Sequence, residues 1–199
     1  MDFALSPRAQ ALCQQLDAFL QRYVLPHNAA WHACVQQGVY PPPFLEDLKT
    51  LAREEGLWNL FLPSLDAAAP GMGLSNLDYA PLAELMGRVH WAPEVFNCSA
   101  PDTGNMELLH RFASGQQRTQ WLEPLLNGTI RSAFAMSEPD VASSDPTNLQ
   151  TTVRREGNQL VLNGRKWFIT GVAHPHCKLL IVMARNAPDA GAHDPTEAS

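Results

Sequence analysis

The sequence predicts an α+β protein in which an all-helical N-terminal domain is followed by an incomplete antiparallel β domain. Apolar residues recur at helical spacing through the first half of the chain, whereas short alternating segments separated by turn residues follow Gly128. Helices first and strands second indicate two separate layers or domains rather than alternating βαβ units. We therefore predict a helical domain over residues 1–128, a partial β domain over 129–185 and a disordered tail over 186–199.

The first helix is predicted from its capping residues. Ser6 is a favourable N-cap, and Pro7 takes the first helical position, where its missing N–H carries no penalty. Pro26 should kink or restart the helix, and the three prolines at 41–43 should end it. The apolar stripe between these points comprises Leu12, Leu16, Phe19, Leu20 and Tyr23.

Further helices are predicted before Gly128. The second should begin at Phe44 and stop at Gly56, because glycine suits the left-handed C-terminal position of a helix. Ser75 and Asp78 have the spacing of a capping box and should open a third. The remaining segments are a loop over 63–73 and helical stretches roughly over 93–112 and 116–126.

The predicted strands follow Gly128. Glu156-Gly157-Asn158 is a hairpin-like turn between two alternating segments. The expected strands are 129–136, 149–155, 159–163, 166–170 and 178–184.

Composition excludes several classes of protein. A hydrophobic content of 45% with 17% charged residues is typical of a folded chain. The net charge of -6, with arginines scattered rather than clustered, argues against nucleic-acid binding. The N-terminus shows no signal peptide, and no apolar run approaches the ~20 residues that span a bilayer. With four cysteines and no CxxC spacing, we expect a reduced, cytoplasmic protein without a membrane span.

One cluster contains residues that could bind a metal. The segment HPHC at 174–177 provides two imidazoles and a thiol, but a structural zinc site needs a fourth ligand at workable spacing. The segment is therefore interpreted as a turn between two strands, and no metal site is predicted.

Two segments carry the functional signal. SEPDVASSD at 137–145 follows an apolar run, and RKWFITG at 165–171 follows the predicted hairpin. Taken alone, the first could be a proline-directed turn with Ser or Asp caps, and Phe168 could be a core aromatic residue on a strand. Together the two segments resemble the flavin-binding signature of the acyl-CoA dehydrogenase family. APDTGNMELL and QQRTQWLEPLLNG are similar to the branch of that family acting on long-chain or 4-hydroxylated acyl groups.

The resemblance implies FAD as cofactor, acyl-CoA as substrate and a set of site residues. Ser137 takes the place of the family's usual Thr at the flavin rim, and Ser144 is expected to contact acyl-CoA as well. Phe168 matches a position that is usually Trp, and Trp167 directly precedes it, so the ring that faces the cofactor is left open. The implied flavin-binding residues are Phe134, Ala135, Met136, Ser137, Glu138, Pro139, Asp140, Val141, Ala142, Ser143, Ser144, Phe168, Ile169 and Thr170.

The reaction that the resemblance implies is α,β-dehydrogenation of an acyl-CoA thioester. The family's catalytic base is a Glu of a C-terminal helical domain, which this chain does not match, so no catalytic residue is assigned. We expect a C-terminally truncated form that is inactive alone. The alternative is a non-catalytic flavin- and acyl-CoA-binding or assembly subunit completed by a separate C-terminal polypeptide. Full-length members are expected to be homo-oligomers, and neither the electron acceptor nor the acyl chain length follows from the sequence.

Overall fold

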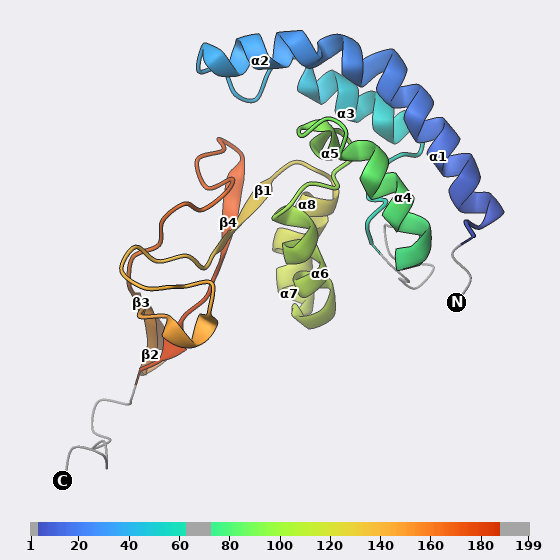
Figure 1. Ribbon diagram of the computed structural model, residues 1–199. Coiled ribbons are helices and arrows are strands. Elements are labelled where there is room, and N and C mark those ends of the chain that lie inside the picture. Colours follow the sequence, from blue (N-terminus) through green and yellow to red (C-terminus); the bar gives the residue numbers. More distant parts are fainter. Residues whose placement is uncertain (1–3, 63–72, 188–199) are drawn as a thin grey trace. The chain divides into compact units, whose positions relative to one another are not determined.

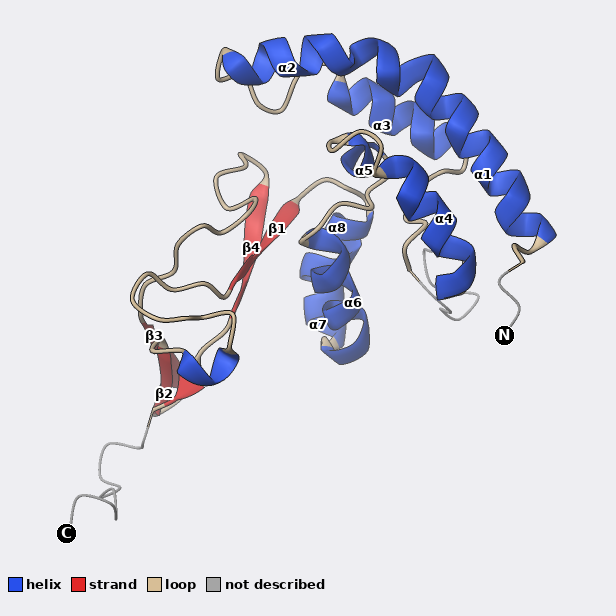
Figure 2. Ribbon diagram, viewed as in Figure 1, coloured by secondary structure: helices blue, strands red, loops and turns tan. Residues whose placement is uncertain are grey.

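The computed structural model describes residues 4–62 and 73–187 of the chain, which forms two compact units (Figure 1). We call Met1–Arg131 the helical unit and Ser132–Ser199 the β unit. The predicted fold class is confirmed, with helices in the first unit and small sheets in the second (Figure 2). The predicted loop at 63–73, apart from its last residue, lies outside the described residues.

The helical unit follows the predicted order of helices. Its first helix passes through a π-helical turn at Leu20–Val24 and a 3-10 turn at Leu25–His27 before α2, so the restart expected at Pro26 is confirmed. A second π-helical turn, Arg118–Leu122, lies between α7 and α8. The α-helices are α1 (Pro7–Phe19), α2 (Asn28–Gln36), α3 (Leu45–Glu54), α4 (Asn76–Met86), α5 (Ala92–Val95), α6 (Asp102–Phe112), α7 (Gly115–Gln117) and α8 (Glu123–Leu126).

The predicted caps are formed, but one predicted helix is broken. The Ser6 hydroxyl accepts a hydrogen bond from the Ala9 N–H at 3.1 Å, and the Ser75 hydroxyl accepts one from the Asp78 N–H at 3.1 Å. The prediction of helical structure throughout 93–112 is wrong. Helix α5 ends at Val95 and α6 begins only at Asp102, because Asn97 takes a left-handed φ of 53° that no helix continues.

The core of the helical unit is aromatic and aliphatic. Phe19 packs edge-on against Phe96 with ring centroids 5.3 Å apart, and both rings are fully buried. Trp31 stacks on Trp91 at 4.7 Å with an interplanar angle of 4°. Offset-stacked and edge-to-face pairs of this kind add to the stabilisation from buried area. Both indoles are buried in the core of the helical unit.

Two buried asparagines hold the C-terminus of α8. Asn59 and Asn97 both adopt left-handed backbone conformations, with φ of 56° and 53°, which asparagine tolerates better than most residues. The Asn97 amide donates to the Asn59 side-chain oxygen at 2.7 Å and to the Leu125 carbonyl at 3.0 Å. The Asn59 amide donates to the Leu126 carbonyl at 3.0 Å. These bonds bring side-chain donors to the last two carbonyls of the helix, which lie beyond its regular hydrogen-bond ladder.

A buried ion network lies where the helical unit ends. The Arg131 guanidinium lies between two carboxylates, with Nε 2.6 Å from Asp102 Oδ2 and Nη1 3.1 Å from Glu94 Oε1. Lys49 Nζ is 3.3 Å from the same Glu94 oxygen, and the Tyr40 hydroxyl donates to the other at 2.9 Å. Burial alone would raise the pKa of Glu94, but the two cations and the tyrosine outweigh it and lower that pKa.

The β unit, as far as residue 187, contains two small sheets (Figure 2). One pairs β1 with β4, and the other has the order β3-β2-β5. The hairpin β2–β3 is antiparallel as predicted, with Glu156 opposite Gln159. The pairing of β2 with β5 is parallel. The strands are β1 (Arg131–Ala135), β2 (Thr152–Glu156), β3 (Gln159–Asn163), β4 (Cys177–Val182) and β5 (Arg185–Asn186).

Two predictions for the second half need correction. The strand predicted at 166–170 is a loop. The Trp167 N–H donates to the Ser137 carbonyl, which does not belong to a strand, and Phe168 has a left-handed φ of 49°. The ordered chain also extends past 185, since Asn186 belongs to β5 and the Ala187 N–H bonds the Val153 carbonyl at 2.9 Å. Residues 188–199 of the predicted tail lie outside the described residues.

Candidate functional site

The turn that follows β1 is held by its own small polar side chains. The Glu138 N–H donates to the Ser143 hydroxyl at 2.7 Å, and the Ser143 N–H donates to the Val141 carbonyl at 2.8 Å. Asp145 accepts the Thr147 N–H at 2.9 Å and so caps the short 3-10 turn Pro146–Asn148. The serine and aspartate of the motif therefore build a rigid turn, which places Glu138 on its inner side.

The Glu138 carboxylate is buried and fully engaged. One oxygen accepts the Gln150 N–H at 2.6 Å, and the other accepts the Thr151 N–H at 2.9 Å and Lys166 Nζ at 2.8 Å. Its side chain is only 4% exposed. Burial alone would raise the pKa of Glu138, but the bonds from Lys166, Thr151 and Gln150 outweigh it and lower that pKa to about 2.

We expect the stability of the β unit to fall in acid because of Glu138. A carboxyl whose folded pKa lies below its unfolded value of about 4.3 stabilises the fold above that value, and this contribution is lost as pH falls towards about 2. Carboxyl-carbon NMR of the folded protein should show Glu138 still ionised at pH 3. In the Glu138→Gln variant, the loss of stability of the β unit in acid should be smaller than in the parent. A Glu138 carboxyl that titrates near 4.3 would contradict the buried geometry.

Lys166 connects the turn after β1 with the loop after β3. Its ammonium donates both to Glu138 and to the Met136 carbonyl, the latter at 2.9 Å. One residue further on, the Trp167 N–H donates to the Ser137 carbonyl at 3.1 Å. The two motifs therefore lie side by side, joined by one ion pair and two bonds to main-chain carbonyls. We call the Glu138–Lys166 pair, with its bonds to Met136, Gln150 and Thr151, the clamp.

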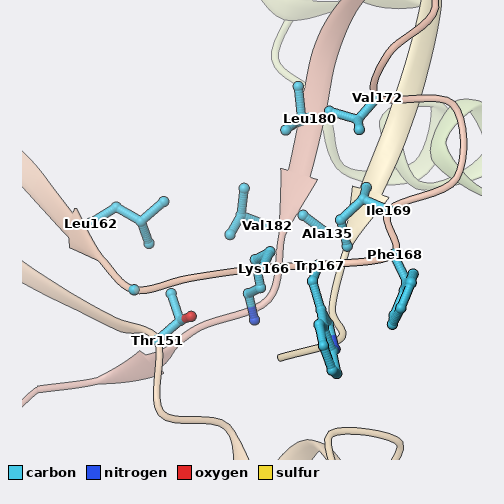
Figure 3. Close-up of a pocket in the computed structure, with 11 residues that line it drawn as sticks. Ala135, Thr151, Leu162, Lys166, Trp167, Phe168, Ile169, Val172, Leu180 and Val182 are labelled. Atoms are coloured by element: carbon cyan, nitrogen blue, oxygen red, sulfur yellow. The ribbon is translucent and has the colours of Figure 1, made fainter. Parts of the chain in front are cut away.

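The loop held by the clamp presents two aromatic rings. Trp167 and Phe168 have centroids 4.6 Å apart and are tilted by 42°. Phe168 is 83% exposed and Trp167 44% exposed, and both rings project to the same side of the loop (Figure 3). Beside them is a cavity of about 330 Å³, within the usual range for ligand pockets. Its apolar wall is formed by Ala135, Leu162, Ile169, Val172, Leu180 and Val182.

The structure brings part of the predicted site together. Met136 and Ser137 meet the loop that carries Phe168 and Ile169, and Ala135 lines the same cavity as both. The other predicted residues lie on the turn or on exposed surfaces. Phe134 is on the exposed face of β1, Pro139, Asp140, Val141 and Ala142 form the outer turn, and Ser144 and Thr170 are exposed.

Two residues important for this geometry were not predicted. Lys166 follows a strand in the sequence and resembles any surface lysine until its buried partner is known. Gly164 passes so close to Thr151 that an added Cβ would lie 2.6 Å from the Thr151 Cβ and 2.7 Å from its Cα. The signal that was available is the dipeptide Asn163-Gly164 between a strand and a basic pair, where a glycine permits close backbone approach.

The other candidate features serve structure. Residues 171–176 form the predicted turn, in which the His176 N–H donates to Nδ1 of the buried His174 at 3.0 Å. Among residues 4–62 and 73–187, no three metal-ligating side chains gather in one place. Within the same ranges, no helix has the length and apolar character needed to cross a membrane.

Comparison with known protein families shows to which family the chain belongs. The model of the acyl-CoA dehydrogenase N-terminal domain matches residues 6–129, and the model of the middle domain of the same family matches residues 133–197. The chain belongs to the acyl-CoA dehydrogenase family. A probable acyl-CoA dehydrogenase of Mycobacterium tuberculosis, FadE2, is 51% identical over 97% of this chain and 47% of its own length. Acyl-CoA dehydrogenase family member 11 of Mus musculus is 45% identical over 96% of this chain and 25% of its own length.

Solved structures share the same fold, among them one of an acyl-CoA dehydrogenase. One from Mycobacterium abscessus, assigned to this family, is 50% identical with a TM-score of 0.85, covering 96% of this chain and 48% of its own. The FAD complex of PigA, 24% identical with a TM-score of 0.72 over 95% of this chain and 46% of its own, has the same fold. The chain thus spans about half the length of the M. tuberculosis relative and of these two structures.

Proposed function

We propose that the protein takes part in FAD-dependent α,β-dehydrogenation of acyl-CoA thioesters, and that this chain supplies residues that receive the isoalloxazine ring. Family membership supports the reaction class. The observation that carries the site is Phe168, which is 83% exposed while its backbone has a φ of 49°. A bulky residue in this region of the backbone persists only where surrounding bonds hold it, and such residues gather at ligand sites.

The residues present fit a flavin. An isoalloxazine has a flat apolar face and a polar rim, which call for aromatic walls and hydrogen-bond donors. Trp167 and Phe168 offer rings for the face, and the half-buried Ser137 offers a hydroxyl and a backbone N–H for the rim. Bound FAD would supply the redox chemistry, which belongs to the cofactor, while the protein orients it. Ser144, exposed on the same turn, is the proposed contact to acyl-CoA.

No carboxylate of this site is proposed as the base that removes the α-proton. A general base works best with a pKa near the working pH, whereas the pKa of Glu138 is lowered to about 2 and both its oxygens accept bonds. Glu138 therefore holds the structure of the site. Assembly into homo-oligomers, or with a separate C-terminal polypeptide, is part of the proposal.

We expect FAD to bind this chain weakly and through its isoalloxazine end. The motifs described cover the ring but not the adenine, and losing half the contacts of a large ligand weakens binding on the order of a thousandfold. Saturation-transfer NMR detects such weak binding. The methyl protons of the dimethylbenzene ring should receive saturation from the protein, and the adenine protons should receive little.

Two variants separate this site from non-specific apolar contact. Phe168→Ala should abolish the methyl signal, because it removes the more exposed ring of the pair. Leu160→Ala removes another exposed apolar side chain of the β unit, 69% exposed, and should leave the signal unchanged. Equal loss in both variants, or a signal that survives in Phe168→Ala, would contradict the proposed site.

A further inference from the structure

The clamp suggests a more specific role for its two charged residues, Lys166 and Glu138. We infer that Lys166 and Glu138 are positioning residues, which orient Trp167 and Phe168 for the flavin ring. This inference rests on the proposed function and deepens it. Three features of the molecule support the inference: the Glu138 carboxylate is held rigidly, Lys166 directly precedes the two rings, and few other contacts restrain those rings.

The Glu138 carboxylate, which anchors the clamp, is rigid because main-chain N–H groups hold it. The Glu138 carboxylate is fixed by the N–H groups of Gln150 and Thr151, at 2.6 and 2.9 Å, and the Glu138 N–H is itself fixed by Ser143. A charged acceptor bonded in this way cannot rotate without breaking both bonds and leaving the buried Thr151 N–H unsatisfied. The ammonium of Lys166 therefore meets an acceptor whose position is determined by the turn and by the start of β2.

The chain between the clamp and the two aromatic rings is short. Lys166 directly precedes Trp167, so the ammonium that binds Glu138 and the Met136 carbonyl fixes the chain next to the aromatic pair. Beyond it, the backbone turns into the left-handed region at Phe168. For a phenylalanine this conformation is unfavourable by about 1–2 kcal/mol, so it needs external restraint.

Few other restraints act on the rings. The loop does not belong to a strand, and Phe168 is 83% exposed while Trp167 is 44% exposed. In the described part of the β unit, the clamp and the Trp167 N–H bond to Ser137 are the hydrogen bonds recorded between residues 165–168 and the turn after β1. The orientation of the rings thus depends on the ammonium together with the Trp167 N–H bond, whereas the hairpin β2–β3 is held by its own ladder.

The clamp also differs from an ordinary ion pair. Lys166 and Glu138 have side chains only 11% and 4% exposed, whereas Arg154 and Glu156, another ion pair in the described part of the β unit, are 50% and 52% exposed. Removing one partner of a buried pair leaves an uncompensated charge, but replacing both can leave the fold intact. A variant that lacks both charges should therefore stay folded, so a change in its rings reports their orientation rather than the stability of the fold. Glu156→Gln provides the matched exposed control.

The test labels all five tryptophans with 5-fluorotryptophan and records fluorine NMR spectra of the full chain. Trp167, the one tryptophan of the β unit, is assigned with Trp167→Phe. In Lys166→Met and in the double variant Glu138→Gln/Lys166→Met, we expect the Trp167 signal to shift or broaden while the other four stay unchanged. Amide signals of the hairpin β2–β3 should be kept in the double variant. Lys166→Arg, which keeps the charge, should restore most of the Trp167 signal, and Glu156→Gln should change nothing.

The affinity for riboflavin is measured alongside the fluorine spectra. Riboflavin carries the isoalloxazine without phosphate or adenine, and its affinity should fall about tenfold in the double variant, because the rings are then no longer preorganised for the ligand. An unchanged Trp167 signal in both variants would overturn the inference. So would loss of the hairpin signals in every variant, because the pair would then hold the fold rather than the rings. If riboflavin does not bind the parent, the proposed site fails while the fluorine spectra still decide the clamp.

Discussion

Replacing Arg131 by Met should destabilise the helical unit by about 3–5 kcal/mol. The substitution leaves Asp102 and Glu94 buried, with side chains 2% and 6% exposed, after removal of the guanidinium that lies between them. Breaking a buried ion pair from one side has an effect of this size because a charge then remains without compensation. Lys49 still faces Glu94, so Asp102 should account for most of the loss. Urea unfolding followed by the fluorescence of the buried tryptophans measures it.

An exposed ion pair of the same unit provides the control. Arg88 lies 2.9 Å from Asp17, with side chains 58% and 43% exposed, and Arg88→Met should change stability by no more than about 1 kcal/mol. If both arginine variants unfold at the same urea concentration, the Arg131 network contributes no more than a surface pair. Arg131→Lys should lie between the parent and Arg131→Met, since lysine keeps the charge but lacks the planar guanidinium that contacts both carboxylates.

Gly164→Ala should destabilise the β unit by about 3 kcal/mol, the upper end of the usual range for overpacking. The added Cβ would lie 2.7 Å from the Thr151 Cα, and no side-chain rotation can relieve a clash with main-chain atoms. Because the Thr151 N–H binds Glu138, a displaced Thr151 should also loosen the clamp. Amide hydrogen exchange of the hairpin β2–β3 measures the loss of stability.

Gly157 provides the comparison within the same unit. An added Cβ there meets nothing within 4 Å, so Gly157→Ala reports only the effect of its φ of 60°, about 1–2 kcal/mol. Thr151→Ala in the Gly164→Ala background should restore stability only in part, because the Thr151 Cα remains. If Gly164→Ala exchanges no faster than Gly157→Ala, the close approach at Thr151 is not rigid.

The sequence predicts the local structure well where a single segment determines it. The caps at Ser6 and Ser75 and the turn at Gly157 follow from residue type and spacing, and the structure confirms them. The helical stretch at 93–112 and the strand at 166–170 were wrong because tertiary bonds override local preference. Asn97 is held left-handed by its bonds to Asn59 and α8, and Trp167 pairs with the turn after β1.

The candidate site was predicted only in its outline. Resemblance to the family brought SEPDVASSD and KWFIT together, but it did not give the contacts between them. Lys166 and Gly164 act through partners 28 and 13 residues away, Glu138 and Thr151, and no periodicity or spacing shows such a pairing. The roles of Ser137, Ser144 and Phe168 towards ligands stay predictions.

The strand pairing of the β unit has a consequence for the order of folding. Hairpin β2–β3 closes across a two-residue turn at Gly157 and Asn158, whereas β1 pairs with β4, a strand that begins only at Cys177. Contacts distant in the sequence have a larger entropy of loop closure and form more slowly than local ones. During synthesis, β1 therefore emerges well before its partner, and the hairpin should form first. The loop carrying Trp167 and Phe168, which runs from β3 to β4, acquires its final path only when the β1–β4 ribbon closes.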